Sequence, residues 1–427
     1  MHKEDFYYCD EPTIVEEQKS AFVNRYKDWE MQIRCIENAW IIPWSKEYED
    51  IQGEVLTEDG TIVENVCSGS IYDTAQSKNY SIPTEFDSIN EVIYLGGINK
   101  CWGHYITDGI CKLWCINAPE IKLLLKKDIP VVFTYDWIIE DKIASSWRHI
   151  IDLLGWENVN IVPLTKITKF KRIYIPSNSL QHSTKGRFYT SEFNQLVDSL
   201  KNAALSHDMK PPKYEKVYLS RTRLTSDHAE FGEKGIEKLF KKAGFKILYP
   251  EQLSFEEQVY YLHNAKEVAG TMGSISHNFM FCNSETKVYI LRKSWYTNDF
   301  QYVINQVSNL DVTYIDVNLS VFLNSNSNDG PFFLYVNDNL KRFFLDKYGL
   351  HVKGNFNSRS FSSYAMICMR RPNFQSRNIA PDYYYDKMAI ELNNHIDFSK
   401  RIYRLLLNLT GHNVRATITR LVKLFTR

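Results

Sequence analysis

The sequence lacks the signals that mark secreted and membrane-spanning proteins. Its opening segment, MHKEDFYYCDEPTIVEEQKS, has no apolar core of a signal peptide, so we expect no secretory leader. No window approaches the ~20 consecutive apolar residues that a helix needs to cross a bilayer. These absences favour a cytoplasmic protein.

Paired cysteines and closely spaced aspartates are missing as well. The 8 cysteines form no CxxC pair, which disfavours a zinc ribbon or redox motif and favours reduced thiols. No D-x-D triplet occurs, so we expect no carboxylate-bound Mg²⁺ or Mn²⁺, and no other cofactor is indicated. The 51 basic and 51 acidic residues cancel, so the overall charge does not favour a nucleic-acid partner.

The residues that are present alternate in the pattern of a soluble α/β protein. With 427 residues, 44% of them apolar and 24% charged, the chain is long enough for two domains with separate cores. From residue 91 onward, apolar runs of strand length alternate with amphipathic runs of helix length, which predicts parallel sheets covered by helices. The predicted strands lie at 91–95, 130–135, 159–164, 171–176, 216–220, 245–249, 266–270, 287–291 and 312–316.

Two Rossmann-like, doubly wound domains facing a cleft require the fewest assumptions. We place an N-terminal region with a β-hairpin at 1–90, a first Rossmann-like domain at 91–208, a second at 213–323 and a mostly helical region at 331–427. The polar segment 209–215 would join the two domains. In such sheets ligands bind beyond the carboxyl ends of the strands, so residues that follow a strand are candidate site residues.

A histidine and an aspartate follow the first predicted strand. If residues 104–118 form one helix, then His104, Asp108, Cys111 and Cys115 lie on one face of it. Asp108 could hold one nitrogen of the His104 ring and make the other a better base, an arrangement that activates a hydroxyl near neutral pH. The alternative is a structural histidine beside an ordinary buried acceptor.

Two arginines follow the strand predicted at 216–220. Arg221 and Arg223 would point to opposite sides of an extended segment, so one of them faces the cleft, and its position directly after the strand favours Arg221. A guanidinium binds phosphate through two hydrogen bonds and keeps its charge. Glu233 could neutralise or orient one of these arginines. The alternative for either arginine is a surface ion pair.

A run of small and polar residues, GTMGSISHNFMF, follows the strand predicted at 266–270. Its spacing differs from GxGxxG and from the phosphate-binding P-loop. The small residues would still let an anionic ligand approach the backbone N–H groups of a helix start, whereas the alternative is a plain helix cap. The candidate donor-binding residues in this run are Gly273, Ser274, Ile275, Ser276, His277 and Asn278.

Further candidates lie at two other strand ends. Glu251 follows a predicted strand and could accept a hydrogen bond from a ribose or a base. Ser254 and Glu257 have the spacing of a capping box, which predicts a structural role at a helix start. Gly96 and Gly97 are predicted to end the first strand in a turn and to support the site beside it.

Together these motifs resemble glycosyltransferase family 61, in particular its branch of bacterial capsule and surface-polysaccharide enzymes. The resemblance covers roughly residues 91–292 and rests on GGINKCWGHYITDGICKLW, VYLSR, FGE, AGF, PEQLSFEEQ and GSISHNFMF in this order. Many members read HGAGLTN where this chain reads MGSISHN, a departure that concerns the identity of the donor.

The resemblance implies a GT-B fold and an inverting, metal-independent transfer of a sugar from a nucleotide-diphosphate sugar to a hydroxyl of a glycan or lipid-linked glycan. By position, it implies that His104 and Asp108 are catalytic, with His104 as the favoured base and Asp108 as the alternative. Arg221 matches a phosphate-facing arginine, Glu233 a glutamate on the following helix, and residues 274–278 a nucleotide-binding loop.

The segment 398–427 contains seven Lys or Arg residues and no acidic residue, with apolar residues at helical spacing. A basic amphipathic helix is typical of binding to an anionic membrane surface, which would make the protein peripheral on the inner face of the cell membrane. The alternative is a closing helix that packs across both domains.

Two other functions compete with the transferase. A sugar-nucleotide isomerase or dehydrogenase would need a glycine fingerprint near residues 94–104, and that segment has none. A non-catalytic glycan- or lipid-binding subunit of a polysaccharide assembly complex is compatible with all of the motifs. Release of nucleotide diphosphate from a nucleotide sugar would separate these functions.

Overall fold

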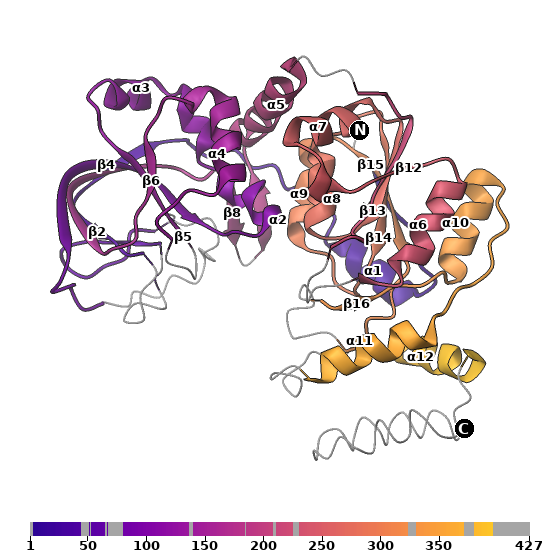
Figure 1. Cartoon of the computed structure of the whole chain (residues 1–427). Coiled ribbons are helices and arrows are strands. Elements are labelled where there is room, and N and C mark those ends of the chain that lie inside the picture. The colour runs from indigo at the N-terminus through magenta and orange to yellow at the C-terminus, as the bar shows by residue number, and fades with distance from the viewer. Residues whose placement is uncertain are drawn as a thin grey trace.

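The structure, a computed structural model, describes residues 3–43, 51, 53–64, 66, 80–135, 140–183, 185–207, 211–224, 230–322, 330–370 and 380–395. Over these ranges the chain forms two six-stranded sheets with helices packed against them (Figure 1). The expected α/β class is confirmed. We call each sheet with its helices a lobe, the first lobe containing β4 and the second containing β13.

The first sheet is built around the strand that leads into the site. β4 (Asp87–Ile98) lies between β5 (Val131–Tyr135) and β7 (Thr168–Pro176) and is parallel to both. All residues of β5 are buried, as in a strand covered on both faces. The sheet order is β3 (Val55–Leu56), β2 (Ile33–Ile41), β7, β4, β5 and β6 (Ile161–Pro163), with β2 antiparallel to its two neighbours.

Gly96 and Gly97 do not end the strand, contrary to the sequence prediction. β4 continues to Ile98, and the pairing with β5 shifts register between Tyr94 and Gly97. Gly96 has a φ of +90°, and an added Cβ would lie 3.1 Å from the Lys112 side chain. A glycine pair here makes a bulge instead of a turn, because it supplies the left-handed φ that a bulge requires.

The single helix predicted over residues 104–118 is also wrong. The chain forms three short pieces instead, namely α2 (Trp102–Tyr105), η3 (Asp108–Ile110) and η4 (Leu113–Asn117). The break lies at Thr107, whose hydroxyl donates to the Gly103 carbonyl at 2.7 Å. That carbonyl would otherwise accept the next helical N–H, so the side chain competes with the helix.

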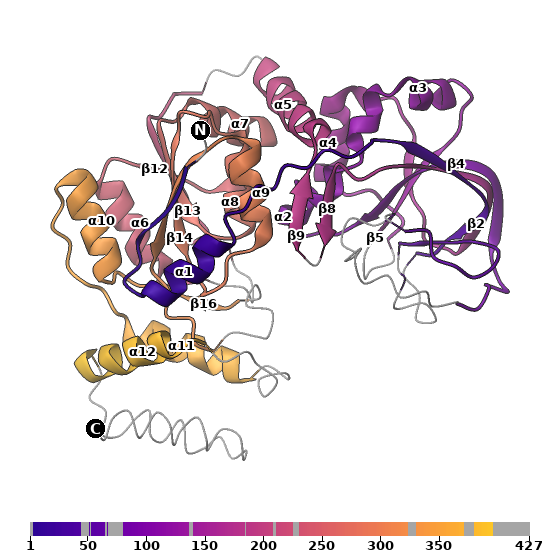
Figure 2. The same cartoon turned by 180° about the vertical axis from the view of Figure 1, so that it is seen from behind.

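A β-hairpin precedes the helix that leaves the first lobe. The pattern of residues 187–207 predicts one long helix, but the helix, α5 (Ser191–Ser206), begins only at Ser191. The residues before it form β9 (Gly186–Tyr189), which is antiparallel to β8 (Leu180–Ser183). In both views this hairpin lies beside α2, between the two sheets (Figure 2).

The second sheet is entirely parallel and follows the predicted strands closely. Its order is β1 (Lys3–Tyr8), β15 (Asp311–Asp316), β14 (Lys287–Arg292), β13 (Glu267–Thr271), β10 (Lys216–Leu219) and β12 (Lys246–Leu248). The N-terminal strand β1 pairs with β15 at the edge of this sheet. The first residues of the chain therefore belong to the second lobe, followed by α1 (Pro12–Ser20).

Helices cover both faces of the second sheet. α6 (Glu233–Lys242) and α10 (Asp338–Tyr348) share one buried cluster with it. On the other face lie α7 (Phe255–Asn264), α8 (Ser274–His277), η7 (Asn278–Phe281) and α9 (Asp299–Val307). The predicted capping box of α7 is confirmed, since the Ser254 and Glu257 side chains each bond the backbone of the other.

One hydrophobic cluster joins the two lobes. It contains Trp147 of α4 (Ser145–Ile151) and Phe193 of α5 in the first lobe, together with Phe255, Phe281 and Phe300 of the second. All of these side chains are buried, so the lobes share a core where α7 and η7 meet α5 and where α9 meets β9. This shared core fixes how the ends of β4 and β13 face each other.

The C-terminal helices α11 (Ser358–Arg370) and α12 (Asp382–His395) pack together beside the second lobe (Figure 1). Among the residues described, no helix has the length and apolarity needed to cross a membrane. The basic segment predicted at 398–427 lies outside the described residues.

Candidate functional site

The two lobes touch where α2 meets α8. A Cβ added at Gly103 would lie 2.8 Å from Ser274 Oγ and 2.9 Å from His277 Nδ1, so only glycine permits this approach. Beside it, Trp102 Nε1 donates to Asn278 Oδ1 at 2.8 Å. The contact brings the residues after β4 next to the residues after β13, where ligands of parallel sheets bind.

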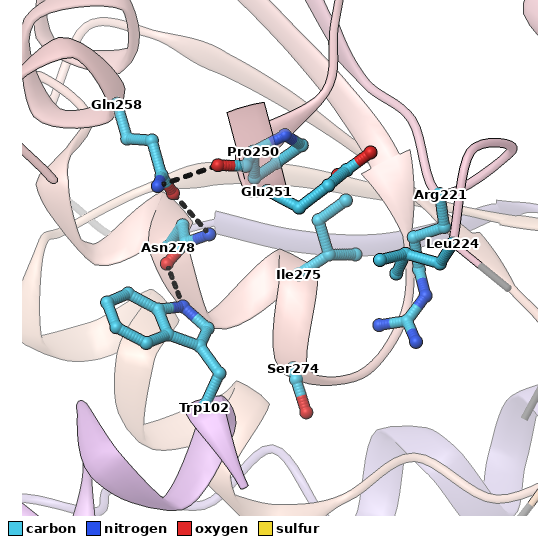
Figure 3. A pocket seen from close by; sticks show the side chains of 9 residues that line it. All are labelled: Trp102, Arg221, Leu224, Pro250, Glu251, Gln258, Ser274, Ile275 and Asn278. Carbon is cyan, nitrogen blue, oxygen red and sulfur yellow. Dashed lines mark hydrogen bonds between the residues drawn. The ribbon is translucent and has the colours of Figure 1, made fainter. Parts of the chain in front are cut away.

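Two adjoining pockets lie at this contact. The first, which we call the apolar pocket, has a volume of about 280 Å³ and is shown in Figure 3. The second, the polar pocket, has a volume of about 270 Å³. Arg221 and Ser274 line both. The polar pocket is lined by Cys101, Gly103, His104, Arg221, Met272, Gly273, Ser274, His277, Lys293, Ser294, Asn298, Phe300 and Phe332.

His104 and Asp108 are joined as predicted, although no continuous helix carries them. Nδ1 of His104 lies 2.6 Å from Asp108 Oδ2. The imidazole is 39% exposed and lines the polar pocket, whereas the Asp108 side chain is only 11% exposed. If the Nδ1–H group donates its hydrogen bond to Asp108, Nε2 of the neutral ring carries no proton and keeps its lone pair.

The electrostatic surroundings adjust the basicity of His104. Burial disfavours the imidazolium, but the hydrogen bond to Asp108 and the negative charge of that carboxylate together act against it, and the pKa of His104 is raised above the usual 6.5. The ring also packs edge-on against Phe300, with centroids 5.7 Å apart. Asp108 therefore fixes the orientation of the His104 imidazole and increases the basicity of its other nitrogen, Nε2, as a general base requires.

Arg221 belongs to a buried charge cluster. Its Nε lies 3.2 Å from Glu230 Oε1, and Lys293 Nζ lies 2.8 Å from the same oxygen. The Glu230 side chain has no exposed surface, and although burial opposes ionisation, Lys293 and Arg221 lower its pKa. The two cations, Arg221 and Lys293, thus share the single carboxylate of Glu230. The cluster therefore has a net charge of one positive unit at the wall of the pocket.

Glu233 supports Arg221 through the main chain. Both oxygens of its buried carboxyl group accept from the Arg221 backbone N–H, at 3.0 and 3.2 Å, and one also accepts from the Tyr218 hydroxyl at 3.1 Å. Burial, followed by repulsion from Glu230, raises the pKa of Glu233 to about 8. The partner of the Arg221 guanidinium is therefore Glu230, and Glu233 positions the strand end.

The loop between β13 and η7 is divided between binding and structure. Gly273 has a φ of +118° and approaches the Lys293 ammonium, and the Ser274 hydroxyl faces the pockets. Ile275 lines the apolar pocket. Ser276 is buried, and its hydroxyl bonds Gln301 and the Gly273 backbone, so it holds the turn closed.

The last two residues of the loop are fixed by burial and hydrogen bonding. Burial, followed by the nearby His104 ring, lowers the pKa of His277 to about 3, which keeps its imidazole neutral. Asn278 donates to Gln258 while accepting from Trp102, and Gln258 in turn donates to the Pro250 carbonyl (Figure 3). This hydrogen-bonded chain ties α2 to α7.

Of the remaining predicted residues, Glu251 lines a pocket and Arg223 does not. Glu251 lines the apolar pocket in η6 (Pro250–Gln252). Arg223 points elsewhere, with its guanidinium over the Tyr249 ring at 3.7 Å and bonded to Gln252 at 2.7 Å. The expectation that only one of the two arginines faces the pocket agrees with this geometry.

Several pocket residues were missed from the sequence. Lys293 directly follows β14 and is buried, so its place after a parallel strand was an available signal. Glu230 and Phe300 carried no comparable signal. Glu230 lies in the short β11 (Glu230–Phe231), which pairs with β16 (Phe332–Phe333), and Phe300 lies in α9. Their places depend on long-range packing.

The comparison with known families agrees with this geometry. Residues 102–289 match the sequence model of the family Glycosyltransferase 61. The matched range includes His104, Arg221 and the loop from Gly273 to Asn278 and ends before Lys293. No curated protein gives a significant match.

Proposed function

Since the chain carries a glycosyltransferase 61 domain and is a glycosyltransferase, we propose that it moves a sugar from a nucleotide-diphosphate sugar to a hydroxyl of a glycan acceptor. The proposed reaction is inverting and independent of metal, on lobes in a GT-B arrangement. The proposed setting is bacterial capsule or surface-polysaccharide synthesis, with a glycan or lipid-linked glycan as acceptor.

The observation that carries this proposal is a base and a cation cluster in one pocket. His104 comes from the first lobe, and Arg221 and Lys293 come from the second. A single displacement needs a base on the attacking hydroxyl and positive charge on the departing diphosphate, on opposite sides of the reacting carbon. The polar pocket offers both.

The proton and charge transfers follow from the contacts. Nε2 of His104 takes the acceptor hydroxyl proton as the new carbon–oxygen bond forms, and Asp108 stabilises the imidazolium through Nδ1. The bond between the anomeric carbon and the diphosphate oxygen breaks with its electron pair on oxygen. Asp108 is the less suited base, because it lies behind the ring with little exposed surface.

In this proposal, side-chain cations stabilise the negative charge that develops on the departing diphosphate. α8 has only four residues, so its dipole is small compared with that of a longer helix. Arg221 offers planar donors, Lys293 a point charge, and Ser274 a hydroxyl on the shared wall of the two pockets. The apolar pocket, with Glu251 at its edge, would hold the nucleoside.

One assay tests the proposal. The protein is incubated with a panel of nucleotide sugars and acceptor extracts in EDTA, and the release of nucleotide diphosphate is measured. We expect release without added metal, slow by hydrolysis and faster with the acceptor. Absence of release across the panel would refute the proposal and favour the non-catalytic binding subunit, which the family match disfavours.

A further inference from the structure

The hairpin β8–β9 carries a cation beside the proposed base. Arg187 of β9 lies with its guanidinium 3.8 Å from the centroid of the Phe300 ring. The same ring makes T-shaped contacts with the imidazoles of His104 and His277, with ring centroids 5.7 and 5.8 Å away. Phe300 is buried and lines the polar pocket together with His104, so Arg187 lies against a wall of that pocket and shares this ring with the proposed base.

Apart from the Phe300 ring, the Arg187 guanidinium has no hydrogen-bond or ion-pair partner among the residues described. Its buried Nε makes no hydrogen bond, and within the described ranges no carboxylate lies in ion-pair distance of the group. The acidic groups nearby have other partners, since Asp299 pairs with Arg25 at 3.7 Å and Asp108 pairs with His104 through Oδ2, while the buried Asp108 Oδ1 makes no hydrogen bond. An Arg in such a place is available to bind an anion, for which its fork of donors is suited.

His182 lies on the same face of the hairpin as Arg187. The two residues are paired directly across the strands, and side chains opposite each other project to one face. Burial, followed by repulsion from Arg187, lowers the pKa of His182, so this histidine does not neutralise the arginine but adds a neutral donor or acceptor beside it. The opposite face of β9 is occupied, because Phe188 packs there under Arg25 and Lys27.

We propose that Arg187 binds an oxyanion of the acceptor, so that the glycan receiving the sugar is acidic and carries a carboxylate or a phosphate near the attacking hydroxyl. This inference rests on the proposed transferase function and names the chemistry of its acceptor. Arg187 comes from the hairpin between the lobes and shares the Phe300 ring with His104, whereas the cations assigned to the donor diphosphate, Arg221 and Lys293, follow strands β10 and β14 of the second sheet.

Three probes that differ only at C6 test the inference: methyl β-D-glucoside, methyl β-D-glucuronide and methyl β-D-glucoside 6-phosphate. Their binding to the full chain is measured with inorganic pyrophosphate at saturation, so that Arg221 and Lys293 are occupied. We expect at least one anionic probe to bind about tenfold more tightly than the neutral one, as a charge-assisted hydrogen bond allows. The preferred probe then identifies a carboxylate or a phosphate.

Two variants assign the preference to a residue. R187Q should abolish it while leaving pyrophosphate affinity and the melting temperature unchanged, and K185Q, at an exposed position of the same hairpin, should leave it intact. The inference is overturned if wild-type protein shows no preference, binds none of the probes, or if the preference survives in R187Q. A loss of pyrophosphate affinity in R187Q would also overturn it, by assigning Arg187 to the donor. Failure of the transferase itself would appear separately, as absence of donor turnover.

Discussion

At the scale of single residues, the side chains proposed to act on the substrates are each held in place by a neighbouring carboxyl group. His104 is exposed to the polar pocket, while Asp108 lies behind it and reaches only the ring. Arg221 is held at its backbone by Glu233 and at its guanidinium by Glu230. Such doubly held groups keep the geometry that a base or a phosphate ligand needs before the substrate arrives.

Replacing His104 tests the base. In H104A we expect transfer to be lost by a factor of about 100 or more, because general-base catalysis contributes that much. Pyrophosphate affinity should stay nearly unchanged, since the cations lie on the other lobe. Transfer rate and pyrophosphate binding are measured on the same preparation. A loss of binding with preserved turnover would move His104 to the donor side.

Replacing Asp108 tests how the base is tuned. Transfer should fall as pH drops below the raised pKa of His104, because the protonated ring cannot accept the hydroxyl proton. In D108N the hydrogen bond to a carboxylate is lost, so this acidic limb should move to lower pH, and the plateau rate should fall. The pH dependence of kcat/KM reports both effects, with the exposed E120Q as the control. An unmoved limb would show that Asp108 does not set the basicity.

Arg221 and Arg223 form a matched pair two residues apart. R221A should weaken pyrophosphate binding by about 10- to 100-fold, the worth of a hydrogen bond to a charged group at about 1.5–3 kcal/mol. R223A should have little effect, because its guanidinium lies on Tyr249 and bonds Gln252. Titration calorimetry compares the two. Equal effects would exclude a special role for Arg221.

At the scale of elements, the second lobe was the more predictable half. The five strands of its sheet between residues 216 and 316 were located from the hydrophobic pattern alone, because buried parallel strands are short apolar runs between amphipathic helices. The pieces after β4 were not, because Thr107 bonds its own helix carbonyl and Gly96 forms a bulge. These local contacts compete with periodicity and leave no trace in it.

The candidate site follows the same division. His104, Arg221 and Ser274 were predictable since they follow strands, whereas Glu230, Phe300 and Arg187 come from elements whose placement depends on tertiary packing. The strand β9 in particular includes residues 187–189, whose pattern reads as the start of a helix. Chemistry at strand ends is visible in a sequence, while the walls of a pocket are not.

The close approach of α2 to α8 is open to test by one added methyl group. G103A should lower stability by about 1–3 kcal/mol, as overpacking does, and should reduce transfer more than pyrophosphate binding. The reason is that α2 must withdraw from Ser274 and His277, which takes His104 with it. Urea unfolding and transfer rates measure the two effects. Unchanged values for both would mean that the helices have room to spare.

At the scale of the whole molecule, the chain crosses between the lobes twice. β1 and α1 belong to the second lobe, the chain then enters the first lobe at β2, and it returns after α5 (Figure 2). Together with the hydrophobic cluster around Phe300, these crossings couple the lobes. The N-terminal strand β1 is therefore part of the hydrophobic core of the second lobe.

Two tyrosines near the N-terminus test this placement. Tyr8 is 1% exposed and packs edge-on against Phe343 of α10, whereas Tyr26 is 39% exposed. Y8A should cost about 3–5 kcal/mol in the free energy of unfolding, as the loss of a buried aromatic ring does. Y26A should cost much less. Urea denaturation gives both values, and similar small costs would show that β1 is dispensable.

The pairing of β1 with β15 also sets an order of assembly on the ribosome. Residues 3–8 are made some three hundred residues before their partner strand at 311–316. Because nascent chains fold from the N-terminus as units complete themselves, the sheet around β4 forms while this leading strand still waits. The second sheet can be completed only after translation has passed residue 316. A chain that stalls or ends before that point therefore has the first sheet but leaves β1 without its partner strand.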